Sequence, residues 1–243
     1  PSILNTAAAR PTIASRLYGG LALVAAAVAL SAWFAPYPLD RRVAAALLAA
    51  YGLLVVVRPA TWLVLMPALW PVVDLTAWTG HIHFTESDAL ALTTLAALGL
   101  REAFAPPQPT LAGRAPLKLT VTALALFGLL AASVAVSGLR GLLPLPPLDA
   151  AALVGYNSSL NALRVGKGFV LAFALIPFLH LAVRRDGDAA LDRLATGLTL
   201  GLGSCALAAL WERLAFTDLT DFATDYRTTA LFWEMHVGGA ALD

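Results

Sequence analysis

The feature that most constrains this chain is a series of long apolar stretches that contain no charged side chain. The clearest covers residues 119–139. A helix needs roughly 20 predominantly apolar residues to cross a hydrocarbon core about 30 Å thick. Inside a bilayer the backbone polar groups must be satisfied within the segment, which favours helices. The sequence therefore predicts an all-α fold, a polytopic helical bundle integral to a membrane.

The composition excludes the main alternatives to a membrane protein. The chain is 59% hydrophobic and 13% charged, whereas a soluble domain is about 45–50% apolar and about 25% charged. Disordered chains are poor in hydrophobic residues. The 16 basic residues are nearly cancelled by 15 acidic ones, so nucleic acid is not an expected partner. A single cysteine, Cys205, excludes an internal disulfide and a cysteine-based metal site.

Seven membrane spans and the beginning of an eighth are expected. They cover residues 17–36, 43–57, 60–73, 89–100, 119–139, 168–183 and 194–211, and a further apolar stretch begins near Thr229. The third contains Pro67 and Pro71, so we expect it to be kinked. The second, third and fourth are shorter than a full span, and a helical hairpin that enters the membrane and returns is the alternative for them.

The organisation predicts one integral membrane domain over residues 1–243. No internal repeat interrupts the series of apolar stretches. The chain begins at Pro1 and ends within a pattern of small apolar residues, and for this reason we expect it to be part of a longer protein. Orientation follows the bias of Lys and Arg toward cytoplasmic loops. Arg184 and Arg185 flank a span directly and residues 74–88 contain no Lys or Arg, which favours a cytoplasmic N-terminus.

Ionisable residues near membrane depth are costly, and they mark candidate functional sites. The first cluster is a predicted outer loop, residues 74–88. It contains His81, His83, Glu86 and Asp88, side chains of the kinds that bind divalent metals. A His-x-His pair directs both rings to one side only on an extended strand. We therefore favour a solvated loop with no metal, anchored at the interface by Trp78 and Phe84.

The second cluster lies immediately before the sixth span. On a helix, Asn157, Asn161, Arg164 and Gly168 share one face, and Lys167 follows Arg164 by three residues. A guanidinium and an ammonium together suit a phosphate or a pyrophosphate. The alternative is that the two long basic side chains simply extend to the membrane interface. That alternative explains the cations but not the asparagines, and both interpretations remain open.

The third cluster lies in the C-terminal run of residues 218–239, at the mouth of a span. It gathers Asp221, Asp225, Tyr226, Arg227, Glu234 and His236 within sixteen residues. An arginine held among carboxylates, with a histidine or glutamate as acid or base, is a plausible reaction centre. The alternative is structural, with Arg227 paired to Asp225 or Glu234.

The residues Asp225-Tyr-Arg-Thr-Thr-Ala-Leu-Phe-Trp-Glu-Met-His-Val-Gly-Gly-Ala240 resemble the arginine-centred motif of the bacterial O-antigen ligase and polysaccharide polymerase superfamily. Residues 160–168 and 73–80 look similar to large, uncharacterised members of that group. The resemblance implies a polytopic glycosyltransferase of the bacterial inner membrane. Such enzymes transfer a glycan from undecaprenyl pyrophosphate to an acceptor sugar on the periplasmic face, without a nucleotide sugar or an obligatory metal.

Within that scheme the resemblance assigns Arg227 to the donor pyrophosphate. Arg164 and Lys167 would assist on the physical argument above, and His236 is the candidate base because no other histidine lies near Arg227. Asn161, Tyr226 and Glu234 are further candidate substrate-binding residues. The chain departs from the family in reading Trp-Glu-Met-His at residues 233–236, where many ligases read Asn-Pro-Asn. The large periplasmic loop and later spans of the family are also missing from it.

Two other classes remain as alternatives. A non-catalytic transmembrane subunit, bound to a larger complex, would fit the alanine-rich and glycine-containing spans, since small residues permit close helix packing. A transporter is the weaker alternative, because the uncharged spans provide no site for a coupling ion at the membrane midplane. No cofactor is expected. The expected partners are membrane lipid, the lipid-linked glycan and other membrane proteins.

Overall fold

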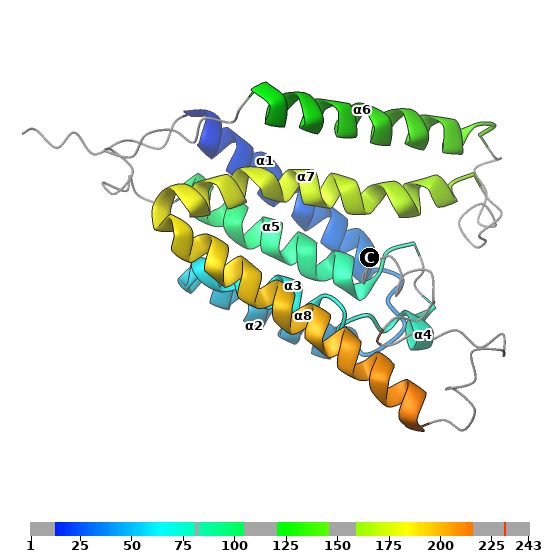
Figure 1. Ribbon diagram of the computed structural model, residues 1–243. Coiled ribbons are helices and arrows are strands. Elements are labelled where there is room, and N and C mark those ends of the chain that lie inside the picture. The colour runs from blue at the N-terminus through cyan, green and yellow to red at the C-terminus, as the bar shows by residue number, and fades with distance from the viewer. Residues whose placement is uncertain (1–12, 81–82, 105–120, 146–158, 216–230, 232–243) are drawn as a thin grey trace, which may run out of the picture.

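The computed structural model describes residues 13–80, 83–104, 121–145, 159–215 and 231 (Figure 1). Within these ranges the fold is helical and contains no strand, which confirms the predicted all-α class. The helices are α1 (Ile13–Phe34), α2 (Arg41–Val57), the 3-10 helix η1 (Pro59–Thr61), α3 (Trp62–Leu69), α4 (Thr76–Thr79), α5 (Glu86–Phe104), α6 (Val121–Leu142), α7 (Asn161–Asp186) and α8 (Asp188–Ala215).

Four of the described helices are long and apolar enough to cross a membrane: α1, α6, α7 and α8. The number rises to five if α2 and the η1–α3 segment, which are bent by 118°, form one broken span. The protein is therefore a helical membrane protein in its described part. The expected count of seven spans and the start of an eighth is not confirmed.

Helix α5 lies at the centre of the bundle (Figure 1). It is packed by α1, α2, α3 and α7, and 14 of its 19 residues are buried. Because protein rather than lipid surrounds it, its surface tolerates Thr93 and Thr94, whose hydroxyls bond to carbonyls one turn earlier. The short apolar run predicted over residues 89–100 is thus the middle of a longer helix with charged ends.

Two glycines allow α1 and α5 to pack in close contact. A Cβ added at Gly19 would lie 2.9 Å from the carbonyl oxygen of Gly99, and one added at Gly99 would lie 2.6 Å from that of Gly19. No real side chain fits at such distances. The α1–α5 interface is therefore a contact between backbones, the arrangement that small residues permit in membrane helices.

The third apolar stretch forms η1 and α3, and the sharp bend of 118° lies before it, at Arg58 between α2 and η1. Pro67 sits inside α3 and has no N–H, so the carbonyl of Leu63 lacks its usual helical partner. That carbonyl faces α8, because a Cβ added at Gly197 would lie 2.7 Å from its oxygen. A bend of 118° is the geometry of a broken span or a re-entrant loop, the alternative stated above for this stretch.

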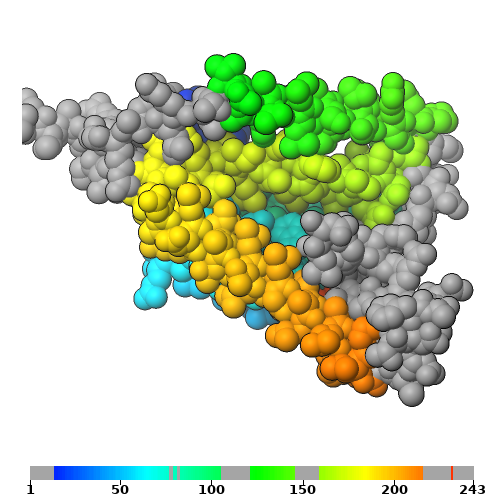
Figure 2. Space-filling model, viewed as in Figure 1, coloured from blue at the N-terminus to red at the C-terminus, as the bar shows by residue number. Residues whose placement is uncertain are grey.

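Helix α6 stands apart from the rest of the bundle. None of its residues is buried, and its main neighbour is α7, against which Phe127 packs on Phe173 with ring centroids 5.1 Å apart. Figure 2 shows it as a separate ridge along one side of the molecule. In a bilayer, lipid would cover this apolar surface.

The helix ends sort into two groups. The ends of α1, α6 and α8 and the starts of α2, α5 and α7 lie together with α4 at the right of Figure 1. We call this the α4 end of the bundle. The opposite end contains the end of α7 at Arg184–Asp186 and the start of α8.

Candidate functional site

Lys167 provides the strongest polar link at the α4 end. Its ammonium forms an ion pair with Asp88 at the start of α5. It also donates a hydrogen bond of 2.8 Å to the carbonyl oxygen of His83 and lies 5.7 Å from the centre of the Phe84 ring. The Asp88 side chain is only 4% exposed and that of Lys167 is 21% exposed. The lysine therefore joins α7 to the central helix.

Asp88 also caps α5. Its Oδ2 accepts hydrogen bonds from the Thr85 backbone N–H at 2.7 Å and from the Thr85 hydroxyl at 3.1 Å. In return, the Asp88 N–H donates to the Thr85 hydroxyl at 3.4 Å. This reciprocal arrangement is a capping box, and a carboxylate is favoured there by the helix dipole. One carboxylate thus satisfies both the helix end and the lysine.

Residues 86–88 form the first turn of α5 inside the bundle, so the prediction that they belong to a solvated loop over residues 74–88 was wrong for these three residues. Glu86 and Ser87 are buried, as is Asp88. The Leu75 N–H donates to the Glu86 carboxylate at 3.2 Å, and the Ser87 hydroxyl donates to the carbonyl of Trp70 at 3.0 Å. The chain turns at Gly80, whose φ of +68° a residue with a side chain rarely adopts.

Aromatic residues cover the same corner. The Trp33 ring N–H donates to the carbonyl of Phe84 at 3.0 Å, and the Trp33 and Tyr37 rings lie 4.3 Å apart. Burial raises the pKa of the Tyr37 hydroxyl to about 12, and the neighbouring Glu86 carboxylate adds to the shift. Loss of the Tyr37 proton would place two negative charges side by side in a buried corner. The hydroxyl is therefore neutral at physiological pH.

Asn161, Arg164 and Lys167, the three residues of α7 predicted to bind substrate, lie in its first two turns and so belong to the long apolar helix itself rather than to the chain before it. Arg164 Nε donates a 2.7 Å hydrogen bond to Asn161 Oδ1, which fixes the direction of the guanidinium. Lys167 instead turns toward α5 and pairs with Asp88. The structure therefore brings Asn161 and Arg164 into contact and partly neutralises Lys167. An ammonium has three donors. Asp88 and the His83 carbonyl are its hydrogen-bond acceptors among the described residues.

The C-terminal candidates lie outside the described residues: Tyr226, Arg227, Glu234 and His236. Asn157 and His81 also lie outside them. In the described part of the chain, no group of three or more His, Cys, Asp or Glu side chains has the geometry to hold a metal ion. Of the residues considered for a metal, Glu86 and Asp88 instead bond to backbone groups of residues 74–88.

Sequence reasoning missed a second ion pair, at the opposite end of the bundle. Arg185 in α7 lies 2.5 Å from the Glu102 carboxylate in α5, and that carboxylate is 7% exposed. The adjacent Arg101 donates to the carbonyl of Val56 at 2.9 Å. The paired residues are separated by 83 positions, and charges at helix ends are ordinary, so no local signal indicated the contact.

No protein-family model matches this chain, and neither the curated proteins nor the solved structures contain a significant match.

Proposed function

We propose that this protein is a membrane glycosyltransferase that moves a glycan from undecaprenyl pyrophosphate to an acceptor. The reaction would take place at the α4 end, which we assign to the periplasmic face of a bacterial inner membrane. The observation that carries the proposal is the start of α7. There a guanidinium oriented by Asn161 and an ammonium lie on successive turns at the end of a membrane-crossing helix.

The chemistry of these two groups fits a pyrophosphate. The planar guanidinium of Arg164 matches two phosphate oxygens at once, and Lys167 contributes a point charge. The Asn161 side chain holds Arg164 by its Nε. A pyrophosphate carries more negative charge than Asp88 and would compete with that carboxylate for Lys167. Binding of the donor would therefore weaken the ion pair between Lys167 and Asp88, which joins α7 to the start of α5.

The motif around Arg227 supplies the proposed reaction centre. The bond between the glycan anomeric carbon and the pyrophosphate oxygen breaks, and a new bond forms from that carbon to the acceptor hydroxyl. Arg227 stabilises the charge that develops on the departing undecaprenyl pyrophosphate. His236 takes the proton of the acceptor hydroxyl, with Tyr226 and Glu234 placing the sugars.

The test is release of undecaprenyl pyrophosphate by the purified protein in liposomes that contain the lipid-linked glycans of its source membrane. We expect Arg227→Ala to abolish release, while the protein stays inserted and folded. Arg140→Ala is the matched control, since this exposed arginine also lies at the α4 end but outside the proposed site. Full release by the Arg227→Ala protein would contradict the proposal.

Helix α6 favours a second candidate, a non-catalytic subunit of a larger membrane complex. Its 22 residues include none that is buried, so the surface of α6 that does not face α7 is available to a partner. Crosslinking in the native membrane separates the two functions. A subunit would give specific protein adducts at Leu126 or Leu130 on α6, whereas an enzyme that works alone would give lipid adducts there.

A further inference from the structure

Helix α7 is interrupted by a proline near its middle. Pro177 has no N–H group, so the carbonyl of Phe173 lacks its usual helical partner. Sharp kinks in helices occur at such positions. The parts of α7 before and after Pro177 can therefore change their mutual angle more easily than two halves of a continuous helix.

This point of α7 is held in place by α1. The Tyr18 hydroxyl donates a 2.6 Å hydrogen bond to the carbonyl of Ala174, and the Tyr18 ring lies 5.4 Å from the ring of Phe178. Tyr18 thus contacts α7 on both sides of Pro177. The next residue, Gly19, lies in the backbone contact between α1 and α5. The middle of α7 is therefore fixed to a closely packed pair of helices and is suited to act as a pivot.

The part of α7 after the proline is anchored to the bundle. Phe178 is buried, and Arg185 forms its ion pair with Glu102 of α5. Helix α8 begins directly after Gly187. We therefore expect this part to keep its position.

The part of α7 before the proline carries α6 (Figure 1). Phe127 of α6 packs on Phe173, and a Cβ added at Gly141 of α6 would lie 2.8 Å from that of Ala162. Both α7 residues precede Pro177, and no residue of α6 is buried. We call residues 161–176 together with α6 the α7 arm.

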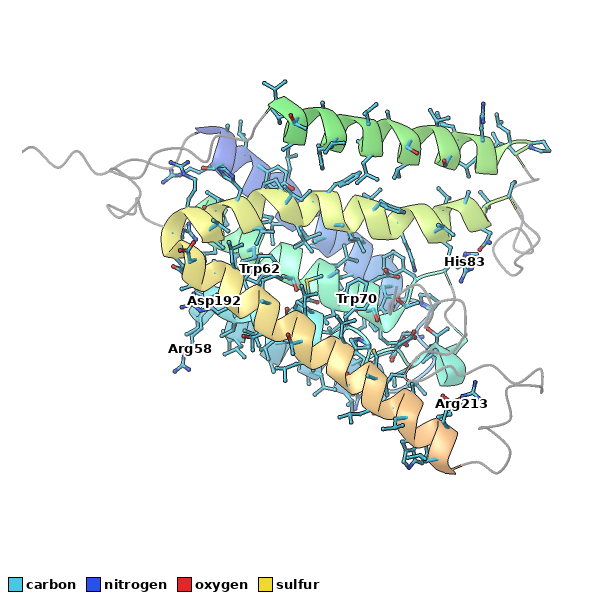
Figure 3. The ribbon with its side chains drawn as sticks, in the orientation of Figure 1. Arg58, Trp62, Trp70, His83, Asp192 and Arg213 are labelled. Carbon is cyan, nitrogen blue, oxygen red and sulfur yellow. The ribbon has the colours of Figure 1, made fainter. Side chains whose placement is uncertain are left out.

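Lys167 fastens the α7 arm to the central helix. Its ion pair with Asp88 and its hydrogen bond to the carbonyl of His83 connect the arm to the start of α5. Figure 3 labels His83 beside the first turns of α7. A Cβ added at Gly166 or Gly168 would meet no described atom within 4 Å, so the positions on either side of Lys167 face open space in the described part of the chain.

Loss of this ion pair would leave a charge that needs water. The Asp88 side chain is only 4% exposed, and a buried carboxylate without a counter-charge is costly. Water reaches Asp88 when α7 moves away from α5. We infer that the α7 arm swings away from α5 about Pro177 when the ion pair between Lys167 and Asp88 is broken. The arm does not depend on the proposed function; within that function, donor binding at Lys167 is the event that opens it.

The experiment measures the distance between two spin labels by pulsed electron paramagnetic resonance, on the full chain in nanodiscs and in a Cys205→Ser background. Leu47→Cys on α2 and Val165→Cys on the arm are both exposed. Val165 lies about 18 Å before Pro177 at 1.5 Å per residue, so a change in kink of about 20° would move it by about 6 Å. We expect Lys167→Met to lengthen the distance by about 3–6 Å, because α2 packs on α5.

Three further variants make the result specific. The double variant Lys167→Met with Asp88→Asn leaves no buried charge and should restore the wild-type distance. Arg193→Met breaks the more exposed ion pair with Asp186 at the opposite end and should change nothing. Pro177→Ala restores the missing N–H and should reduce the lengthening caused by Lys167→Met. Lys167→Gln replaces Lys167→Met if that variant does not fold.

A second label pair, Leu53→Cys and Leu191→Cys, reports on the opposite end of the bundle and should keep its distance in every variant. An unchanged distance in Lys167→Met would overturn the inference. Equal lengthening in the double variant would also overturn it, because the buried charge would not be the cause. Lengthening that persists in full with Pro177→Ala would contradict the pivot.

Inorganic pyrophosphate separates the arm from the proposed function. Added to the wild-type chain, it should lengthen the distance between the labels at positions 47 and 165, and it should add nothing in Lys167→Met. Lengthening in Lys167→Met without a response of the wild-type chain to pyrophosphate would confirm the arm and contradict the pyrophosphate site. A response to pyrophosphate without lengthening in Lys167→Met would contradict the arm and leave the site in place.

Discussion

At the scale of single residues, the central feature is the shared use of Asp88. One carboxylate closes the first turn of α5, through two hydrogen bonds from Thr85, and pairs with Lys167 of α7. Such sharing makes the two helices interdependent. Loss of the carboxylate would leave the Thr85 N–H without its acceptor and a mostly buried ammonium without its counter-charge, and each of these losses is costly.

A double-mutant cycle tests that coupling. We expect Asp88→Asn to lower the free energy of unfolding by about 1–3 kcal/mol, since its amide oxygen still caps the helix but the charge is lost. Lys167→Met should cost less, because Asp88 keeps its bonds to Thr85. The double variant should be more stable than the sum of the two effects predicts. Simple additivity, measured by thermal unfolding in detergent, would show that the ion pair contributes nothing.

Tyr37 predicts a dependence of stability on high pH. The pKa of its hydroxyl is raised to about 12 in the fold, whereas an unfolded tyrosine has a pKa of about 10. The folded state therefore holds the proton more tightly, so this contribution is complete below pH 10 and is lost as the pH rises from 10 to 12. Tyr37→Phe should show a smaller fall in melting temperature over that interval. If the melting temperatures of the wild-type protein and Tyr37→Phe fell equally over this pH interval, the prediction would be contradicted.

At the scale of elements, glycine positions decide which helices touch. Gly19 and Gly99 join α1 to α5, and Gly197 and Gly201 join α3 to α8, in each case by direct backbone contact. Other glycines face open space, such as Gly128 on α6. All of these residues are glycines, but only Gly19, Gly99, Gly197 and Gly201 lie where the backbones of two helices touch.

The matched pair Gly99→Ala and Gly128→Ala tests this distinction. At Gly99 the new methyl group would lie 2.6 Å from the Gly19 carbonyl oxygen. The helices must then separate, and we expect a loss of about 1–3 kcal/mol, as for other overpacked sites. At Gly128 the methyl meets no atom within 4 Å, and the better helix propensity of alanine should give a gain of up to about 1 kcal/mol. Equal melting temperatures for the two variants would argue against the α1–α5 contact.

At the scale of the whole molecule, the bundle surrounds a central helix that has charged ends with helices that are apolar along their length. Helix α5 carries Glu86, Asp88 and Glu102 among its buried residues, and lysine and arginine of α7 pair with Asp88 and Glu102 near its two ends. Helices α1, α6, α7 and α8 have the length and hydropathy to face lipid. In a bilayer, these ion pairs with α7 would shield the buried carboxylates of α5 from the hydrocarbon.

Cysteine labelling tests the grouping of the helix ends. In a Cys205→Ser background, Leu39→Cys and Arg140→Cys lie at the α4 end, and Arg58→Cys and Asp188→Cys lie at the other; all four positions are exposed. In the orientation proposed above, we expect an impermeant maleimide to modify the first two from outside the cell membrane, and the second two only after the membrane is opened. If a cysteine of the first pair and a cysteine of the second pair reacted from the same side of the membrane, the grouping of the helix ends would be contradicted.

The amino-acid sequence alone was sufficient for the helical class, for the apolar segments now seen as α1, α6, α7 and α8, and for the helical placement of Asn161, Arg164 and Lys167. These follow from local properties: the absence of charge over a long stretch, and the angular spacing of residues on a helix. The role of Arg227 stays a prediction, since it lies outside the described residues.

The tertiary structure alone decided which partners the charged groups have. Lys167 and Asp88 are 79 positions apart, and Arg185 and Glu102 are 83 apart. No local pattern encodes either contact, because both depend on how α5 and α7 pack. The same holds for the position of α5. Its moderate apolarity predicts a short span, but an apolar surface is required only of a helix that faces lipid, and α5 is enclosed by other helices.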